Sequence, residues 1–240
     1  MSSLDEAVSA IRKAKPRRVV ILTGAGVSAD SGIPTFRGAG GLWRDFRAED
    51  LATPEAFRRD PAMVWEWYEW RRGLIRDARP NAAHEALARI PGATVVTQNV
   101  DGLHTRAGSQ DVVELHGNIF RVRCVREHTT SDHRDPFPEM PPHCSCGAML
   151  RPDVVWFGEM LPEEAVARAV GAIHAADLLL VIGTSGVVYP AAGFVTLHSG
   201  LSIEVNPEVS AVSSACTFAI PERAAIATPA LVDALLEARA

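Results

Sequence analysis

The run Val19-Val20-Ile21-Leu22-Thr23, followed directly by Gly24-Ala25-Gly26-Val27-Ser28, decides the fold of this chain. Its continuous apolar and β-branched residues predict a strand covered on both faces, because a strand with one wet face alternates apolar and polar side chains. The glycines let the backbone turn sharply and approach a pyrophosphate at a helix N-terminus. The loop alone is a loose dinucleotide fingerprint, since Ala29 stands at the third glycine position and ordinary tight turns also use glycine.

Four more apolar runs of this kind follow along the chain, at residues 93–98, 112–115, 178–183 and 202–206. Helical patterns lie beside or between them at residues 4–13, 81–90, 163–175 and 229–238, the last with Pro229 at its expected start. Strands that alternate with helices predict a parallel sheet. We therefore expect an α/β fold with a Rossmann-like parallel sheet.

Two segments break this rhythm and predict a smaller inserted module. Residues 35–76 are rich in Arg and Trp and indicate a loop followed by helices, whereas residues 120–153 are polar, rich in proline and contain three clustered cysteines. We expect the two segments to pack together as a small helical and zinc-ribbon-like domain. The nucleotide-binding domain would then consist of residues 1–34, 77–119 and 154–240.

Composition and charge narrow the class of protein. The chain has 240 residues, 47% of them hydrophobic, and a formal net charge of −5. Without a basic bias, nucleic acid is not an expected partner. No stretch approaches the roughly 20 apolar residues of a membrane span, and the N-terminus shows no signal peptide. Four cysteines are too few for a disulfide scaffold at this length, which favours a cytoplasmic protein. We also expect a monomer.

Six motifs follow one another between residues 23 and 206. They are Gly24-Ala25-Gly26-Val27-Ser28 with Ser31-Gly32-Ile33-Pro34-Thr35-Phe36-Arg37, Thr97-Gln98-Asn99-Val100-Asp101-Gly102-Leu103-His104, Leu115-His116-Gly117, Arg151-Pro152-Asp153-Val154-Val155-Trp156-Phe157-Gly158-Glu159, Gly183-Thr184-Ser185 and Glu204-Val205-Asn206. In content and order they resemble the motifs of the sirtuin family. The resemblance implies an NAD-dependent enzyme that removes acyl groups from protein lysines.

The reaction that this resemblance implies begins when the acyl-lysine carbonyl oxygen attacks the nicotinamide ribose and nicotinamide leaves. A base then deprotonates a ribose hydroxyl, which attacks the new imidate, and water completes the release of lysine and 2'-O-acyl-ADP-ribose. By resemblance the base is His116, and Asn99 and Asp101 complete the catalytic set. A single His is more often structural, but His116 follows a predicted strand, precedes a glycine and has an ordinary pKa near neutral.

The resemblance also assigns the NAD contacts. Asp101 and Ile33 would form the nicotinamide pocket, Asn99 would position water and ribose, and Phe36 would shield the reactive face. Taken alone, Gln-Asn-Val-Asp favours ordinary turn formation. The expected contacts are Gly24, Ala25, Gly26, Ser28, Ile33, Phe36, Arg37, Gln98, Asn99, Asp101, Gly183, Thr184, Ser185, Asn206 and Ala224.

The substrate would bind as an extended peptide that adds a strand between two enzyme segments, as the family does. From its residues alone, the segment 155–159 predicts an apolar strand that ends in a turn and partly packs in the core. The residues expected to line the peptide site are Val155, Phe157, Gly158, Glu159, Val187 and Tyr189.

The helical segment 63–72 carries the residues that would select the acyl group. Tyr68 and Arg71 are three residues apart and share one helix face, where a hydroxyl and a guanidinium can bind one carboxylate. Without further context, a helix that packs its Trp residues and turns Arg71 and Arg72 to water is the commoner arrangement. The pair resembles the marker of class III sirtuins, which prefer succinyl, malonyl and glutaryl lysine, and Ala52 would be their small pocket residue. We expect succinyl and malonyl to be removed faster than acetyl, because an unpaired buried charge is costly.

The cysteine segment departs from the family pattern of four zinc-binding cysteines in two close pairs. Cys124, Cys144 and Cys146 remain, and Glu127 stands where the fourth cysteine would be. A tetrahedral zinc needs a fourth ligand, for which His128 is the first candidate, followed by His143, His133 and Glu127. The alternative is a module that has lost its zinc and is held by packing. In either case the role of the site would be structural.

Other activities stay open at the level of sequence. ADP-ribosyl transfer, or deacetylation without acidic preference, would leave Tyr68 and Arg71 without a purpose. A regulatory module that senses NAD without turnover would not need a base such as His116. A dehydrogenase would lack a use for the cysteine segment, and no clear ribose-binding acidic residue follows the glycine loop by about 20 residues.

Overall fold

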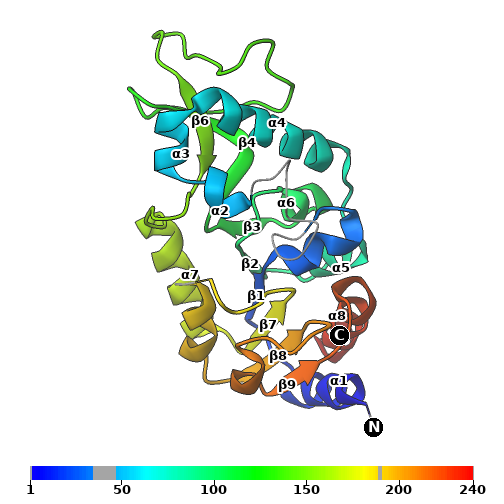
Figure 1. The fold of residues 1–240 in the computed structure, drawn as a ribbon. Helices are drawn as coiled ribbons and strands as arrows, with labels where there is room; N and C mark the ends of the chain where they lie inside the picture. Colours follow the sequence, from blue (N-terminus) through cyan, green and yellow to red (C-terminus); the bar gives the residue numbers. More distant parts are fainter. Residues whose placement is uncertain (1, 35–46, 189–190, 240) are drawn as a thin grey trace.

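The computed structural model describes residues 2–34, 47–188 and 191–239, which form a larger and a smaller lobe (Figure 1). The larger lobe contains a six-stranded sheet with the order β3-β2-β1-β7-β8-β9, parallel throughout. This is the Rossmann strand order, and it confirms the predicted α/β class. The strands are β1 (Val19–Thr23), β2 (Thr94–Thr97), β3 (Asp111–Glu114), β7 (Leu178–Ile182), β8 (Leu201–Val205) and β9 (Phe218–Ile220).

Apolar side chains alternate between two cores on opposite faces of this sheet. In β1, Ile21 faces one core and Leu22 the other, and both are almost fully buried. Coverage on both faces explains why these strands are continuously apolar. One face is covered by α1 (Ser3–Ala14), α5 (Ala82–Ala88) and α8 (Ala224–Arg239), and the other by α7 (Glu163–Ala175) and η3 (Ala191–Leu197). The short helices η1 (Ala25–Ser31), α6 (Leu103–Ala107) and η4 (Ser213–Ala215) lie in the connections.

The smaller lobe joins two segments that are distant in sequence around a core of their own. Trp65, Tyr68 and Trp156 are among its buried residues. The antiparallel strands β4 (Gly117–Cys124), β5 (Thr130–Asp132) and β6 (Leu150–Val154) form its sheet. Strands β4 and β6 pack against the helices α2 (Ala48–Leu51), α3 (Pro54–Arg59) and α4 (Pro61–Asp77), whereas β5 is exposed. The two segments that broke the α/β rhythm therefore pack together. The residue boundaries drawn between the domains stay a prediction.

The structure corrects two expectations about individual elements. Helix α8 begins at Ala224, so Pro229 lies inside it rather than at its start, and its missing N–H removes one hydrogen bond only. Strand β6 ends at Val154, before the segment 155–159 that was expected to be a strand. Residues 120–153 contain most of a three-stranded antiparallel sheet, which agrees with the predicted zinc-ribbon-like module.

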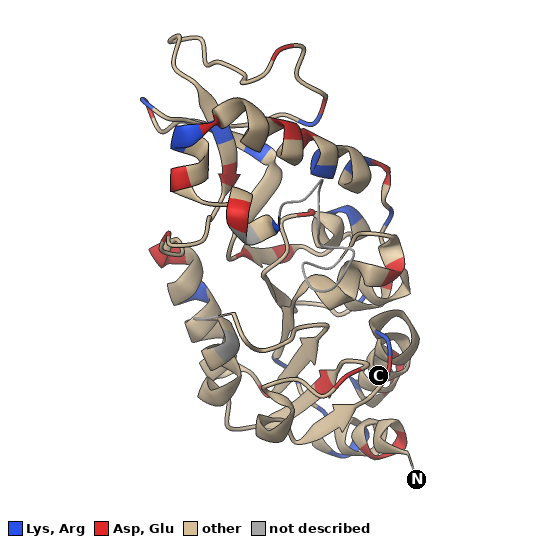
Figure 2. Cartoon of the chain, viewed as in Figure 1, with Lys and Arg blue, Asp and Glu red and all other residues tan. Residues whose placement is uncertain are grey.

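Acidic and basic residues occur in both lobes of the described chain (Figure 2). Acidic and basic residues are mixed along α4, as Figure 2 shows. Within the part of the chain that the structure describes, no helix combines the length and the apolar character that crossing a bilayer requires.

Candidate active site

The loops after β1 and β7 touch at the point where the strand order reverses, which is where open α/β sheets bind ligands. The N–H of Gly24 donates to the carbonyl of Ile182 over 3.1 Å, and that of Gly26 to the carbonyl of Gly183 over 2.8 Å. A Cβ added to Gly26 would lie 2.8 Å from the Gly183 backbone. Glycine is therefore required here by the close approach of two backbone segments.

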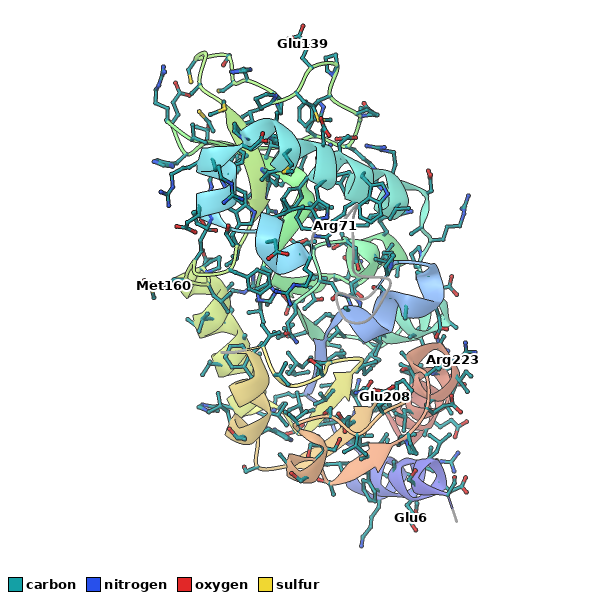
Figure 3. The ribbon with its side chains drawn as sticks, in the orientation of Figure 1. Glu6, Arg71, Glu139, Met160, Glu208 and Arg223 are labelled. Atoms are coloured by element: carbon teal, nitrogen blue, oxygen red, sulfur yellow. The ribbon has the colours of Figure 1, made fainter. Side chains whose placement is uncertain are left out.

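A cavity of about 910 Å³ opens at this edge of the sheet and extends to α4, a size suited to a ligand as large as a dinucleotide. Figure 3 shows Arg71 on the α4 side of the molecule, and Glu208 and Arg223 on the side of β8 and α8; all three line the cavity. Of the predicted site residues, the lining contains Gly24, Ala25, Gly26, Ala52, Tyr68, Arg71, Gln98, Asn99, His116, Val155, Phe157, Gly158, Glu159, Gly183, Thr184, Ser185, Val187, Asn206 and Ala224.

Some predicted site residues are not part of this lining. Ser28 and Asp101 lie just behind it, and Ile33 packs against the core of the smaller lobe. The predictions for Phe36, Arg37 and Tyr189 fall outside the described residues.

His116 is oriented so that one ring nitrogen is left to accept a proton. Its Nδ1 lies 2.8 Å from the carbonyl oxygen of Gln98. A carbonyl oxygen can only accept, so the neutral ring carries its proton on Nδ1 and Nε2 is unprotonated. Burial lowers the pKa of His116, and the hydrogen bond to Gln98 offsets part of that shift. At neutral pH the ring is therefore neutral and able to act as a base.

Behind the cavity, the hydroxyl of Ser28 joins three polar side chains. It donates to Asp101 Oδ2 over 2.8 Å and accepts the Asn99 amide over 3.1 Å. His84 Nε2 lies 3.5 Å from the same oxygen, and His84 Nδ1 accepts the N–H of Asn81, which assigns the His84 proton to Nε2. Ser28 thereby uses its donor and both acceptor positions, and it fixes the side chain of Asn99 from below.

A second series of buried hydrogen bonds fixes the backbone of Asn99. The N–H of Asn99 donates to the Thr97 hydroxyl, which also accepts the Thr23 hydroxyl over 2.9 Å. Thr23 in turn lies 3.1 Å from His104 Nε2. Burial lowers the pKa of His104 to about 3, so its ring is neutral. Sequence reasoning gave Thr23, Thr97 and His104 no role, because these buried residues lie behind the site.

Tyr68 and Arg71 lie on the side of α4 that borders the cavity, as their spacing predicts. The Arg71 guanidinium lies 4.9 Å from the centre of the Trp67 ring. Burial lowers the pKa of Arg71, and Tyr68 opposes that shift. Arg72 is fully buried and donates to backbone carbonyls in the smaller lobe. The arrangement in which both arginines face water is therefore not the one observed.

Trp156 is a cavity residue that the sequence prediction did not include. Its indole N–H donates to the Tyr68 hydroxyl over 2.9 Å, and both side chains are 2% exposed. Burial raises the pKa of Tyr68 to about 12, so its hydroxyl stays protonated. The apolar character of the segment 155–159 assigned Trp156 to the core, and only the tertiary structure shows the hydrogen bond.

The expected peptide wall has already used most of its backbone donors. The N–H groups of Val155, Phe157 and Glu159 donate to the carbonyls of His116, Ala52 and Trp156, and the N–H of Trp156 donates to the Glu159 carboxylate. Gly158 has a φ of +85° with open space where a side chain would stand. A substrate strand would therefore pair mainly with carbonyl oxygens of this segment.

The cysteine segment brings together Cys124, Glu127, Cys144 and Cys146, whose ligand atoms all lie within 4.8 Å of one another. The sulfurs of Cys124 and Cys146 are 3.6 Å apart, near the roughly 3.8 Å that separates two thiolates on one tetrahedral zinc. The donor set fits structural zinc. Glu127 replaces His128 as the fourth member, because His128 follows in a left-handed turn with a φ of +57° and is exposed.

Comparisons with known proteins agree on one family. Residues 24–190 match the model of the Sir2 family. An NAD-dependent protein deacylase of Aquifex aeolicus is 51% identical over 228 residues, which are 91% of this chain and 95% of that protein. A structure of a Sir2 homologue with NAD superposes with a TM-score of 0.91 at 41% identity, over 98% of this chain and 95% of that one. A structure of Sir2 with a p53 peptide and NAD+ has a TM-score of 0.81 at 32% identity and covers 90% and 92%.

Proposed function

Since the chain belongs to the Sir2 family, we propose that it removes succinyl and malonyl groups from protein lysines, with acetyl as a slower substrate. The broader activity is NAD-dependent deacylation of proteins, which yields nicotinamide and an O-acyl-ADP-ribose. NAD would occupy the cavity between the glycine loop and His116. The acylated lysine would enter as an extended peptide beside residues 155–159 and 187–188.

The observation that carries the acidic preference is the pair of donors on α4. Tyr68 and Arg71 line the same cavity as His116, one helical turn apart. A phenol and a guanidinium together match the two oxygens of a carboxylate. A carboxylate offers the Arg71 guanidinium a charge-assisted hydrogen bond, which the methyl group of acetyl cannot offer.

The residues of the larger lobe would perform the chemistry common to every acyl group. His116 Nε2 would accept the proton of a ribose hydroxyl. The hydrogen-bonded side chains of Ser28, Asn99 and Asp101 would present fixed dipoles to the cation-like transition state of the first step. Zinc, bound by Cys124, Glu127, Cys144 and Cys146, would serve to hold the smaller lobe together.

The test compares succinyl-lysine and acetyl-lysine peptides of one sequence, with and without NAD, by mass spectrometry. Arg71→Met should lower kcat/KM for the succinyl peptide by about 30-fold or more, since loss of one partner of a buried charge pair costs about 2 kcal/mol or more. The acetyl peptide should be much less affected. Arg76→Met, on the same helix but paired with Glu69, is the matched control and should leave the ratio unchanged.

Three other outcomes would contradict the proposal at different levels. If acetyl is removed faster by the unaltered enzyme, the chain is a deacetylase and the role given to Tyr68 and Arg71 is wrong. If Arg71→Met leaves the succinyl to acetyl ratio unchanged, Arg71 does not read the carboxylate. If neither peptide changes while NAD still binds, the chain is a sensor without turnover.

A further inference from the structure

The direction of the Tyr68 proton follows from a hydrogen bond made behind the acyl pocket. A phenol oxygen carries one proton and two lone pairs, whereas an indole nitrogen can only donate. Trp156 Nε1 lies 2.9 Å from the Tyr68 oxygen, so Tyr68 must accept there. The O–H bond prefers the plane of the phenol ring, which offers two directions, and the indole N–H blocks one of them.

The proton in the remaining direction has no acceptor within residues 2–34, 47–188 and 191–239, where Trp156 is the one hydrogen-bond partner of the Tyr68 side chain. Tyr68 nevertheless borders the cavity together with Arg71. A buried hydroxyl with a spare donor is satisfied by a ligand that brings an acceptor. A carboxylate does so, and the methyl group of acetyl does not.

The indole is held firmly enough to impose this direction. The Arg151 guanidinium lies 3.5 Å from the centre of the Trp156 ring, and the ring of Phe57 lies 5.1 Å from it. Arg151 is itself fixed by two hydrogen bonds to Glu159, which also accepts the Trp156 backbone N–H over 2.9 Å. Glu159, a predicted substrate-binding residue that lines the cavity, thus holds Arg151 with both of its oxygens and the Trp156 backbone with Oε2.

We propose that Trp156 is a positioning residue for acyl selection: its indole N–H makes Tyr68 an obligate donor toward an anionic acyl tail. This inference rests on the proposed preference for acidic acyl groups. It adds Trp156 to Tyr68 and Arg71 as a residue that determines acyl selectivity, although Trp156 would not contact the acidic tail itself. It also explains why an apolar, buried side chain matters for the binding of a charged one.

The test uses two substitutions that separate the N–H from the bulk of the ring. Trp156→Phe keeps an aromatic ring but removes the donor. Trp156→His loses more of the ring, but its Nε2 superimposes on the indole Nε1 and can still donate. One neutral hydrogen bond corresponds to roughly 0.5–1.5 kcal/mol, or about 2- to 13-fold. Trp156→Phe should therefore lower the succinyl to acetyl ratio of kcat/KM by about 2- to 13-fold, through KM for the succinyl peptide.

Controls show whether the effect runs through Tyr68. Trp65 is another buried Trp of the smaller lobe that donates its N–H, in this case to the carbonyl of Leu150, and Trp65→Phe should not change the ratio. In a Tyr68→Phe background, Trp156→Phe should have no further effect on the ratio. Trp156→His should keep a ratio closer to that of the unaltered enzyme than Trp156→Phe does, and this second variant decides the matter if the Phe variant does not fold.

The outcomes distinguish this inference from the function on which it rests. If the unaltered enzyme prefers acetyl, both are overturned. If it prefers succinyl and Trp156→Phe leaves the succinyl to acetyl ratio unchanged, the positioning role alone is wrong. If the effect of Trp156→Phe persists in the Tyr68→Phe background, or if the His variant loses the ratio and the Phe variant keeps it, ring packing rather than the N–H is responsible.

Discussion

The two walls of the cavity differ in how they use their hydrogen-bonding groups. On the larger lobe, the Ser28 hydroxyl uses its donor and both acceptor positions within the protein, and one of its partners is the Asn99 side chain. The Thr97 hydroxyl fixes the backbone of Asn99. On the smaller lobe, Tyr68 is held from one side and keeps a proton for the ligand. Under the proposed function, the geometry common to all substrates is held by hydrogen bonds within the protein, whereas selection among acyl groups uses a hydroxyl donor that the protein leaves for the ligand.

Replacing His116 should produce the largest effect and should not discriminate between substrates. His116→Ala removes the base, and we expect kcat to fall about 100- to 10,000-fold for succinyl and acetyl peptides alike. Steady-state assays of both peptides measure this, with His174→Ala on the exposed side of α7 as the control. A loss confined to one acyl group would break the proposed division between the walls.

Removing the Ser28 hydroxyl from the wall of the larger lobe should have the next largest effect. Ser28→Ala leaves the Asn99 amide and Asp101 Oδ2 without their buried partner, at a cost of about 1–3 kcal/mol, while Asp101 Oδ1 still accepts the N–H of Leu103. That corresponds to roughly 5- to 150-fold in kcat, equal for both peptides. Ser31→Ala, in the same short helix, loses a contact with Asn81 and should have a much smaller effect. A changed succinyl to acetyl ratio would place selection on the larger lobe.

Substitutions in the metal cluster should act first on the stability of the smaller lobe. Glu127→Ala should speed zinc release to a chelator at least about tenfold, since even a group that merely supports a metal ligand contributes 10- to 100-fold to affinity. Release can be followed with a zinc-sensitive dye, together with the thermal unfolding of the protein. Glu127→Cys should slow release, and Glu139→Ala at an exposed site of the same lobe is the control. Equal release from all variants would show that Glu127 is not a ligand.

The smallest effect concerns pH. Activity should depend on pH through His116, whereas the succinyl to acetyl ratio, which involves Tyr68, should not change. Because the pKa of His116 is lowered from 6.5, the unprotonated base persists at pH 6.5, and activity falls only as pH drops further through that lowered pKa. Both peptides should share this acidic limb. The pKa of Tyr68 is raised to about 12, so the succinyl to acetyl ratio should stay constant from pH 6.5 to 10. A ratio that declines above pH 8 would mean that Tyr68 ionises and does not donate as proposed.

Sequence predicted the parts of the molecule that local pattern controls. The strand of residues 19–23 and the helix of residues 163–175 have the predicted limits, since long apolar runs and helical spacing are local properties. Strand β9 was missed because its three residues, Phe218–Ile220, are too few to show a period. The start of α8 was misplaced because Pro229 is tolerated in the second turn.

The candidate site shows the same limit. Tyr68 and Arg71 could be paired from their spacing on one helix, and Cys124, Cys144 and Cys146 from their chemistry. The bond between Trp156 and Tyr68 joins residues 88 apart, and the one between Thr23 and His104 joins residues 81 apart. Neither pairing leaves a local signal. The sequence prediction placed His128 before Glu127 as the fourth zinc ligand because it considered only which side chains bind zinc. The left-handed turn at His128 is visible only in the structure.

The crossing between the lobes has a consequence for the geometry of the site. Gly117 pairs with Val154, and the N–H of Val155 donates to the carbonyl of His116, so the two passes of chain are tied at adjacent positions. Gly117 has a φ of +77°, and a Cβ there would collide with the Asp153 carbonyl. The two lobes are therefore joined at a crossing that leaves no room for a side chain at residue 117. Because the tie joins residues 116 and 155 directly, the backbone itself sets the distance from the proposed base to the proposed peptide-binding segment.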